Sequence, residues 1–215
     1  MERLLWLYRQ PYDPLRPVVC FDERPCYLIG DTVDGLQMDS NYPRREDYEY
    51  TKNGSCSLLL AVEPLTGRRV ARVYKQRRGV EYTEFMQIVS QEWSQAEQIQ
   101  LVQDNLNTHS FTSFYKHMEA EQAHRLSQRF NFFFTPKKGS WLNAVEIDFS
   151  AIARACLKKR IATMEELTKQ VYAQVAIRTQ KAIKINWQFD LTAARRTFNS
   201  FYHKINSDNQ LIKET

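Results

Sequence analysis

Hydrophobic positions along the chain follow two different periods, which predict strands early in the chain and helices alternating with strands later. Short apolar runs typical of buried strands cover 18–21, 57–62, 70–74, 99–103 and 130–134. From Tyr82 to Trp93 the apolar residues fall three and four positions apart, which predicts a helix leading to the fourth strand. Because such a crossover joins parallel strands, we expect the fourth strand to run parallel to the first. The sequence therefore predicts an α/β protein with a mixed five-stranded sheet.

Helical spacing returns after the fourth strand. Helices are predicted over 111–129, from a Gly139–Ser140 cap to Cys156, from Thr163 to Val175, and over 191–202. Thr163 and Glu166 have the spacing of a capping box, and the Asn53–Gly54 pair is a turn signal ahead of the second strand. The predicted organisation is a lead-in at 1–14, left over from a linker, one domain at 15–206 and a flexible polar tail at 207–215.

Composition adds only weak constraints on function. The chain has 215 residues, a net charge of +5 and a pI near 9.0, which suits a polyanionic partner without requiring one. Its four cysteines form no CxxC pair, so we expect free buried thiols in a reducing cytosol rather than a zinc or redox site. Neither a signal peptide nor a membrane span is recognisable. A cytoplasmic protein without a membrane partner is therefore expected.

Three acidic residues occupy matched positions in this predicted fold. Asp22 and Asp104 each follow a predicted buried strand, and Glu146 lies in the first turn of a predicted helix. The carboxyl ends of parallel strands meet at one edge of a sheet, so the three carboxylates are expected to cluster there. Such a cluster can hold two magnesium ions, which clamp the attacking and leaving oxygens of a phosphodiester. Any one of these acids alone would more often be a helix cap or a solvated loop residue.

Polar and basic residues near the three acids have both functional and ordinary interpretations. Asn105 and His109, which follow Asp104, could orient a metal-bound water or contact a phosphate, or could simply satisfy the backbone of a turn. Lys137 and Lys138, shortly before Glu146, could neutralise DNA phosphates or could be solvated loop residues.

The motifs Phe-Asp-Glu at 21–23, Asp-Asn at 104–105 and Leu-Asn-Ala-Val-Glu at 142–146 resemble those of a known family. Over about residues 15–203 the chain resembles the DDE transposases of the mariner-like superfamily, in their bacterial insertion-sequence branch. The resemblance implies an RNase H-like fold and a catalytic domain at 15–206.

The same resemblance assigns the site. It implies that Asp22, Asp104 and Glu146 bind two Mg²⁺ or Mn²⁺ ions, with Glu23, Asn105, His109 and Asn143 in support. It also selects Glu146 over Asp148, so Asp148→Asn is expected to be close to neutral.

The activity implied by the resemblance is cleavage of DNA at the ends of an insertion sequence, followed by strand transfer into target DNA. Such an enzyme would self-associate in a synaptic complex and work at the nucleoid. Two alternatives stay open: a nuclease of the same fold, and an inactive remnant that binds only DNA or a partner. Family members usually have helix-turn-helix modules ahead of this domain, so a separate recognition polypeptide is a further expected partner. Without it, DNA binding is expected to be weak and indifferent to sequence.

Overall fold

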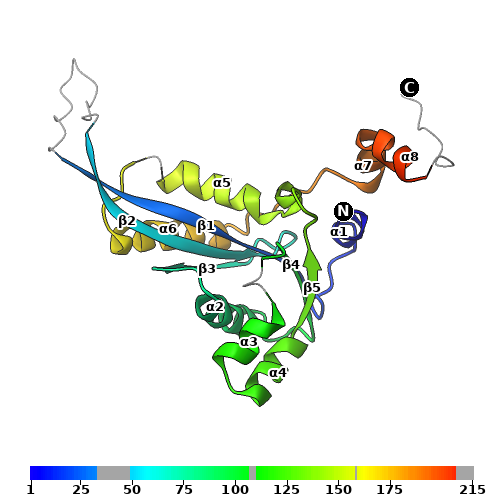
Figure 1. The fold of residues 1–215 in the computed structure, drawn as a ribbon, viewed down its shortest axis with the longest axis horizontal. Helices are drawn as coiled ribbons and strands as arrows, with labels where there is room; N and C mark the ends of the chain where they lie inside the picture. The colour runs from blue at the N-terminus through cyan, green and yellow to red at the C-terminus, as the bar shows by residue number, and fades with distance from the viewer. Residues whose placement is uncertain (33–48, 107–109, 158, 207–215) are drawn as a thin grey trace.

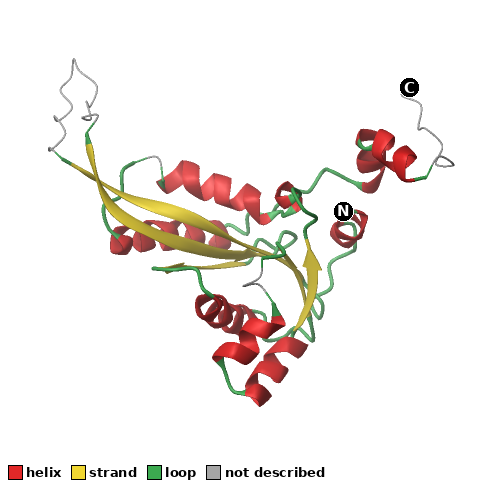
Figure 2. Ribbon diagram, viewed as in Figure 1, coloured by secondary structure: helices red, strands yellow, loops and turns green. Residues whose placement is uncertain are grey.

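The computed structural model describes residues 1–32, 49–106, 110–157 and 159–206. In these residues one sheet has the strand order β3-β2-β1-β4-β5, as Figures 1 and 2 show. The strands are β1 (Val18–Asp31), β2 (Tyr50–Val62), β3 (Arg69–Tyr74), β4 (Ile99–Gln103) and β5 (Phe130–Phe134). β2 runs antiparallel to both β1 and β3, whereas β1, β4 and β5 run parallel to one another. The predicted mixed five-stranded sheet is confirmed.

Helices cover both faces of this sheet (Figure 1). One face packs on α2 (Gly79–Glu92), α3 (Phe111–His117) and α4 (Ala120–Gln128), and the other on α5 (Val145–Cys156) and α6 (Met164–Gln180). The alternation along β1 explains how one strand serves two cores: Val19 and Phe21 enter the α2 core, and Cys20 enters the α5 core. Helices α7 (Leu191–Thr197) and α8 (Asn199–Ile205) lie near α1 (Glu2–Tyr8) at the β5 end of the molecule.

The first strand is much longer than predicted. Only Val18–Cys20 pair with β4, and the strand continues to Asp31 because β2 pairs with the rest of it. The turn predicted at Asn53–Gly54 is wrong, since both residues lie inside β2. Leu28 pairs with Gly54 and Ile29 with Lys52, so Asn53 is the extra residue of a β-bulge, and Gly54 has a φ of 113°. The positive φ of Gly54 thus belongs to a bulge within a strand and not to a turn that reverses the chain.

Two predicted helices are interrupted. The helix predicted over 111–129 is α3 followed by α4, because Met118 has an extended backbone. The helix predicted over 191–202 is broken at Phe198 into α7 and α8. The helix predicted from Ser140 begins instead at Val145, after a 3₁₀ turn at Ser140–Leu142. The Thr163 cap is confirmed, since its hydroxyl accepts a hydrogen bond from the Glu166 N–H at 3.2 Å.

The start of the chain forms a helix that the hydrophobic pattern did not predict. Helix α1 buries Leu4, Leu5 and Leu7 in the same core as α5. Residues 1–8 therefore pack against the domain that follows them in sequence. The predicted tail at 207–215 lies outside the described residues. No helix in the described part of the chain combines the length and apolarity needed to cross a membrane.

Candidate active site

Strand register brings Asp22 and Asp104 to the same end of the sheet. Cys20 and Val102 are a parallel pair, and both are fully buried on the α5 side. Asp22 and Asp104 each lie two residues beyond this pair on neighbouring strands. Asp22 continues the alternation of β1, so its side chain shares the α5 face with that of Cys20. The two acids thus lie on adjacent strands just beyond the end of the parallel β1–β4 pairing. Asp104 directly follows β4 as predicted, whereas Asp22 lies inside β1 rather than at its end.

Asn143 joins the start of α5 to the strand that contains Asp22. Its Nδ2 donates to the Phe21 carbonyl oxygen at 2.7 Å and to Asp22 Oδ2 at 3.4 Å, and its side chain is completely buried. The other Asp22 oxygen accepts from the Glu23 N–H at 2.8 Å. The Glu146 N–H donates to the Asn143 carbonyl at 3.1 Å, so Glu146 lies one helical turn from this junction. The helix start and the strand are therefore locked together beside Asp22.

The carboxylate oxygens at this edge are of the kind that suits a hard divalent cation, but the predicted cluster of three carboxylates is not formed among the described residues. Across the described ranges, no group of three or more His, Cys, Asp and Glu side chains is close enough to hold a metal ion. The chemistry of the donors still fits Mg²⁺ or Mn²⁺, because Asp22, Asp104 and Glu146 offer carboxylate oxygens. Cys20 offers no competing thiolate, since burial raises the pKa of its thiol to about 12. The Asn143 Oδ1 is buried without a hydrogen-bond partner among the described residues.

The predicted supporting residues have different surroundings. Glu23 forms an ion pair with Arg77, whose Nη1 lies 3.1 Å from Glu23 Oε1, and the Glu23 side chain is only 8% exposed. Glu23 therefore holds the Arg77 side chain at the edge of the site. Asn105 is exposed next to Asp104. His109 lies outside the described residues.

Lys137 and Lys138 are exposed in the turn that leads from β5 towards α5. The turn is closed by a hydrogen bond from the Gly139 N–H to the Pro136 carbonyl at 2.8 Å. Lys138 has a φ of 61°, a left-handed conformation that is uncommon for a residue with a side chain. The turn thus presents both ammonium groups to solvent on the chain segment before Asn143.

A buried polar contact that the sequence did not reveal lies just before Asp104. The Tyr82 hydroxyl donates to Gln103 Oε1 at 2.9 Å, and both side chains are buried. Burial raises the pKa of Tyr82, and the nearby Asp104 charge adds to that increase. The hydroxyl therefore stays protonated and holds the end of β4. In the sequence Tyr82 was visible only as a core position of a helix.

The family of DDE superfamily endonucleases matches residues 17–168, which is most of the chain. The chain belongs to the DDE superfamily of endonucleases. Comparison with curated protein sequences gives no match.

Solved structures show the same fold as this DDE endonuclease. The Mos1 transposase paired-end complex with the left transposon end is 13% identical with a TM-score of 0.57, and covers 99% of this chain and 61% of that chain. The Mos1 mariner paired-end complex with Mn is 12% identical, with the same TM-score and coverage. The Mos1 strand transfer complex is 12% identical with a TM-score of 0.56, covering 99% and 60%. The predicted RNase H-like fold is confirmed, and the chain spans about three fifths of the length of these relatives.

Asp148, the other acid in the first turn of α5, has a structural role in this DDE endonuclease. Its side chain is fully buried, and its Oδ2 accepts from Arg69 Nε at 2.8 Å. Its Oδ1 accepts from Arg178 Nε at 2.9 Å, and Arg69 Nη2 also donates to the Ile183 carbonyl at 2.7 Å. Burial lowers the pKa of Arg69, and the negative charge of Asp148 opposes this decrease. Both oxygens of Asp148 are occupied by arginine, so this carboxylate is poorly suited to bind a metal ion.

This network argues against the expectation that Asp148→Asn is close to neutral. The sequence showed Asp148 as a polar residue near a helix start, where solvation is the usual outcome. Its two partners come from β3 and α6, which are distant in the chain, so no local pattern could reveal them. The substitution would leave Arg69, whose side chain is also fully buried, without its counter-charge.

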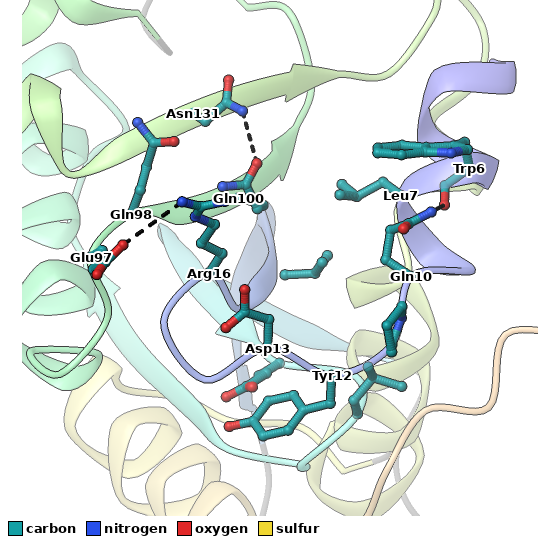
Figure 3. Close-up of a pocket in the computed structure, with 14 residues that line it drawn as sticks. Trp6, Leu7, Gln10, Tyr12, Asp13, Arg16, Glu97, Gln98, Gln100 and Asn131 are labelled. Carbon is teal, nitrogen blue, oxygen red and sulfur yellow. Dashed lines mark hydrogen bonds and ion pairs between the residues drawn. The ribbon is translucent and has the colours of Figure 1, made fainter.

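A cavity of about 490 Å³, shown in Figure 3, has none of the candidate site residues in its lining. It is bordered by Val18, Gln100 and Asn131, which stand in the first rows of β1, β4 and β5, and by Trp6 and Tyr12. The Asn131 amide donates to Gln100 Oε1 at 2.8 Å on one wall of the cavity. Asp22 and Asp104 follow the last paired row of β1 and β4, so the cavity lies at the other end of this parallel pairing.

Proposed function

We propose that this protein is the catalytic part of a DNA transposase from the bacterial insertion-sequence branch of the mariner-like superfamily. In this proposal Asp22, Asp104 and Glu146 hold two Mg²⁺ or Mn²⁺ ions. The observation that best supports it is the pair of hydrogen bonds from Asn143 to Phe21 and Asp22, which fixes the Glu146 helix beside the Asp22 strand. Membership of the DDE superfamily of endonucleases supports the same assignment.

The chemistry needs positioning and charge neutralisation rather than a protein nucleophile. Divalent ions, when bound, activate a water or a DNA 3′ hydroxyl and neutralise charge on the reacting phosphate. Asn143 orients Asp22 by its hydrogen bond, and the Tyr82–Gln103 pair steadies the strand that ends at Asp104. Lys137 and Lys138 are placed to contact DNA phosphates, which supplies affinity without sequence information.

The related structures support two parts of this proposal, the binding of DNA ends and the use of a divalent metal ion. Their names describe a Mos1 paired-end complex with a transposon end, a paired-end complex with Mn and a strand transfer complex. We infer that this protein likewise self-associates on two DNA ends and acts at the nucleoid of the cytoplasm. Specific recognition of those ends is assigned to helix-turn-helix modules, and a separate recognition polypeptide is the proposed partner.

The proposal is tested by incubating the protein with labelled element-end DNA and supercoiled target DNA, with and without a helix-turn-helix partner. Mg²⁺ or Mn²⁺ should support both cleavage at the end and joining to the target, and a chelator should stop both. Cleavage without joining would identify a nuclease of the same fold. DNA binding without either reaction would identify an inactive remnant, and full cleavage in chelator would refute the metal mechanism.

A further inference from the structure

The Tyr8 hydroxyl lies where the Asp22 strand, the Glu146 helix and the N-terminal helix meet. Tyr8 is the last residue of α1, and its Oη donates to the Leu142 carbonyl at 2.9 Å. The same oxygen accepts from the Ala144 N–H at 3.3 Å. It also lies 3.4 Å from the Cys20 Sγ. Because the hydroxyl proton is committed to Leu142, the Cys20 thiol is the donor in that last contact.

These three contacts reach both halves of the candidate site. Cys20 is two residues before Asp22 on β1, and Ala144 is two residues before Glu146 at the start of α5. Leu142 ends the 3₁₀ turn that leads into α5. Burial raises the pKa of Tyr8 well above its ordinary value, so the hydroxyl keeps its proton and remains both donor and acceptor.

We propose that Tyr8 is a positioning residue that couples the strand containing Asp22 to the helix containing Glu146, and so sets the separation of the two carboxylates. The inference rests on the proposed function, because it gives these carboxylates their role as metal ligands. Asn143 already ties the helix start to β1 from within the domain, and Tyr8 adds a second tie from α1. A metal site needs such support because its ligands must be held within a fraction of an ångström.

Simple packing is the alternative role for Tyr8. Its ring lies 5.0 Å from the Trp187 ring, centroid to centroid, and Tyr8→Phe keeps that contact while removing only the hydroxyl. Tyr202→Phe is a matched control. The Tyr202 hydroxyl, on α8, also joins an element to α1, since it donates to Glu2 Oε1 at 2.8 Å.

The experiment compares the full chain with its Tyr8→Phe and Tyr202→Phe variants by two readouts. The first is hydrogen exchange of the Ala144 amide in metal-free protein, with the Val171 amide in α6 as the reference for global opening. The second is the affinity for Mn²⁺ alone, followed by electron paramagnetic resonance, with Glu146→Gln as the variant that removes a ligand. Loss of one hydrogen bond should speed Ala144 exchange and weaken Mn²⁺ binding by about two- to tenfold.

The inference is supported if Tyr8→Phe alone shows both changes while Val171 exchange stays unaltered. It is overturned if Tyr8→Phe matches Tyr202→Phe in both readouts, or if Ala144 and Val171 exchange faster together, which would indicate a stability effect. If Glu146→Gln binds Mn²⁺ as tightly as the wild-type protein does, the proposed function itself fails. The role of Tyr8 at a metal site would fail with it, while Ala144 exchange would still report whether the hydroxyl holds the helix.

Discussion

Arg69 and Asp148 form a buried ion pair, with Arg69 Nε 2.8 Å from Asp148 Oδ2 and neither side chain exposed. The pair joins β3 to α5, and Asp148 lies two residues after Glu146. Because successive residues of a helix are about 100° apart, Asp148 points away from the side on which Glu146 lies. Fixing Asp148 against β3 and α6 therefore also fixes the direction in which Glu146 points.

Asp148→Asn should strongly destabilise the protein. The asparagine keeps the shape but leaves the buried Arg69 without its counter-charge, which typically costs about 3 to 5 kcal/mol. Urea denaturation of the variant and the wild type measures this loss in the free energy of unfolding. Glu165→Gln, which changes an exposed carboxylate on α6, is the control and should alter stability by less than about 0.5 kcal/mol. A similarly small effect of Asp148→Asn would show that the ion pair is not needed for the fold.

Asn143→Ala should lower both stability and DNA cleavage. It removes both hydrogen bonds to β1 and leaves the buried Phe21 carbonyl without this partner, at a cost of about 1 to 3 kcal/mol. Asn131→Ala is the matched control, because it removes an amide hydrogen bond to Gln100 at the other end of the parallel strands. Comparing the cleavage rates of the two folded variants under saturating Mn²⁺ separates a loss of stability from a loss of function at the site. Equal rates for the two would argue against a role of Asn143 at the site.

The sequence predicted the parts of this fold that depend on local pattern. The strands at 99–103 and 130–134 match β4 and β5 at both ends, because each is a short apolar run between polar residues. The Asp22–Asp104 arrangement followed from parallel strand order alone. By contrast, β1 was cut short at Phe21, since its continuation depends on pairing with β2 and not on its own hydrophobicity.

Residues that act through distant partners were not predictable. In the sequence Asp148 looks like an ordinary acid at a helix start, and only the tertiary structure shows that Arg69 and Arg178 from other elements pair with it. Tyr8 likewise gains its contacts only because α1 folds back on the start of α5. The position of Glu146 in the first turn of a helix could be expected from the sequence, whereas the contacts that hold this helix start required the tertiary structure.

The cysteines should resist thiol reagents in the native protein. Burial raises the pKa of Cys20 to about 12 and that of Cys56 to about 11, and it also raises the pKa values of Cys26 and Cys156. The thiolate is the reactive form, so at pH 8 labelling by Ellman's reagent should be slow and should become complete in urea. Labelling should accelerate with pH only as these raised pKa values are approached. Rapid native labelling of Cys20, located by mass spectrometry, would contradict its buried position.

Calcium should separate DNA binding from cleavage. Ca²⁺ takes a larger and looser shell of oxygen ligands than Mg²⁺, so it can occupy a carboxylate site without clamping the reacting phosphate. Element-end DNA should therefore be retained in mobility-shift assays with Ca²⁺ but be cleaved only after exchange into Mg²⁺ or Mn²⁺. Cleavage in Ca²⁺ at the rate seen with Mn²⁺ would be inconsistent with a tightly constrained metal site.

The measurement that tests the central claim most directly is the cleavage rate of Asp22→Asn, Asp104→Asn and Glu146→Gln under saturating Mn²⁺. Each change removes one charged ligand at nearly constant volume, and Glu165→Gln on α6 is the matched control for loss of a carboxylate. Mutation of a residue that only orients a metal ligand typically lowers activity by about 10- to 100-fold. Loss of a ligand itself should therefore lower the cleavage rate by more than about a hundredfold. The variants should keep a Tm near that of the wild type, and Glu165→Gln should cleave at the wild-type rate. A folded variant of any of the three that retains wild-type cleavage would contradict the assignment of Asp22, Asp104 and Glu146 as the catalytic acids.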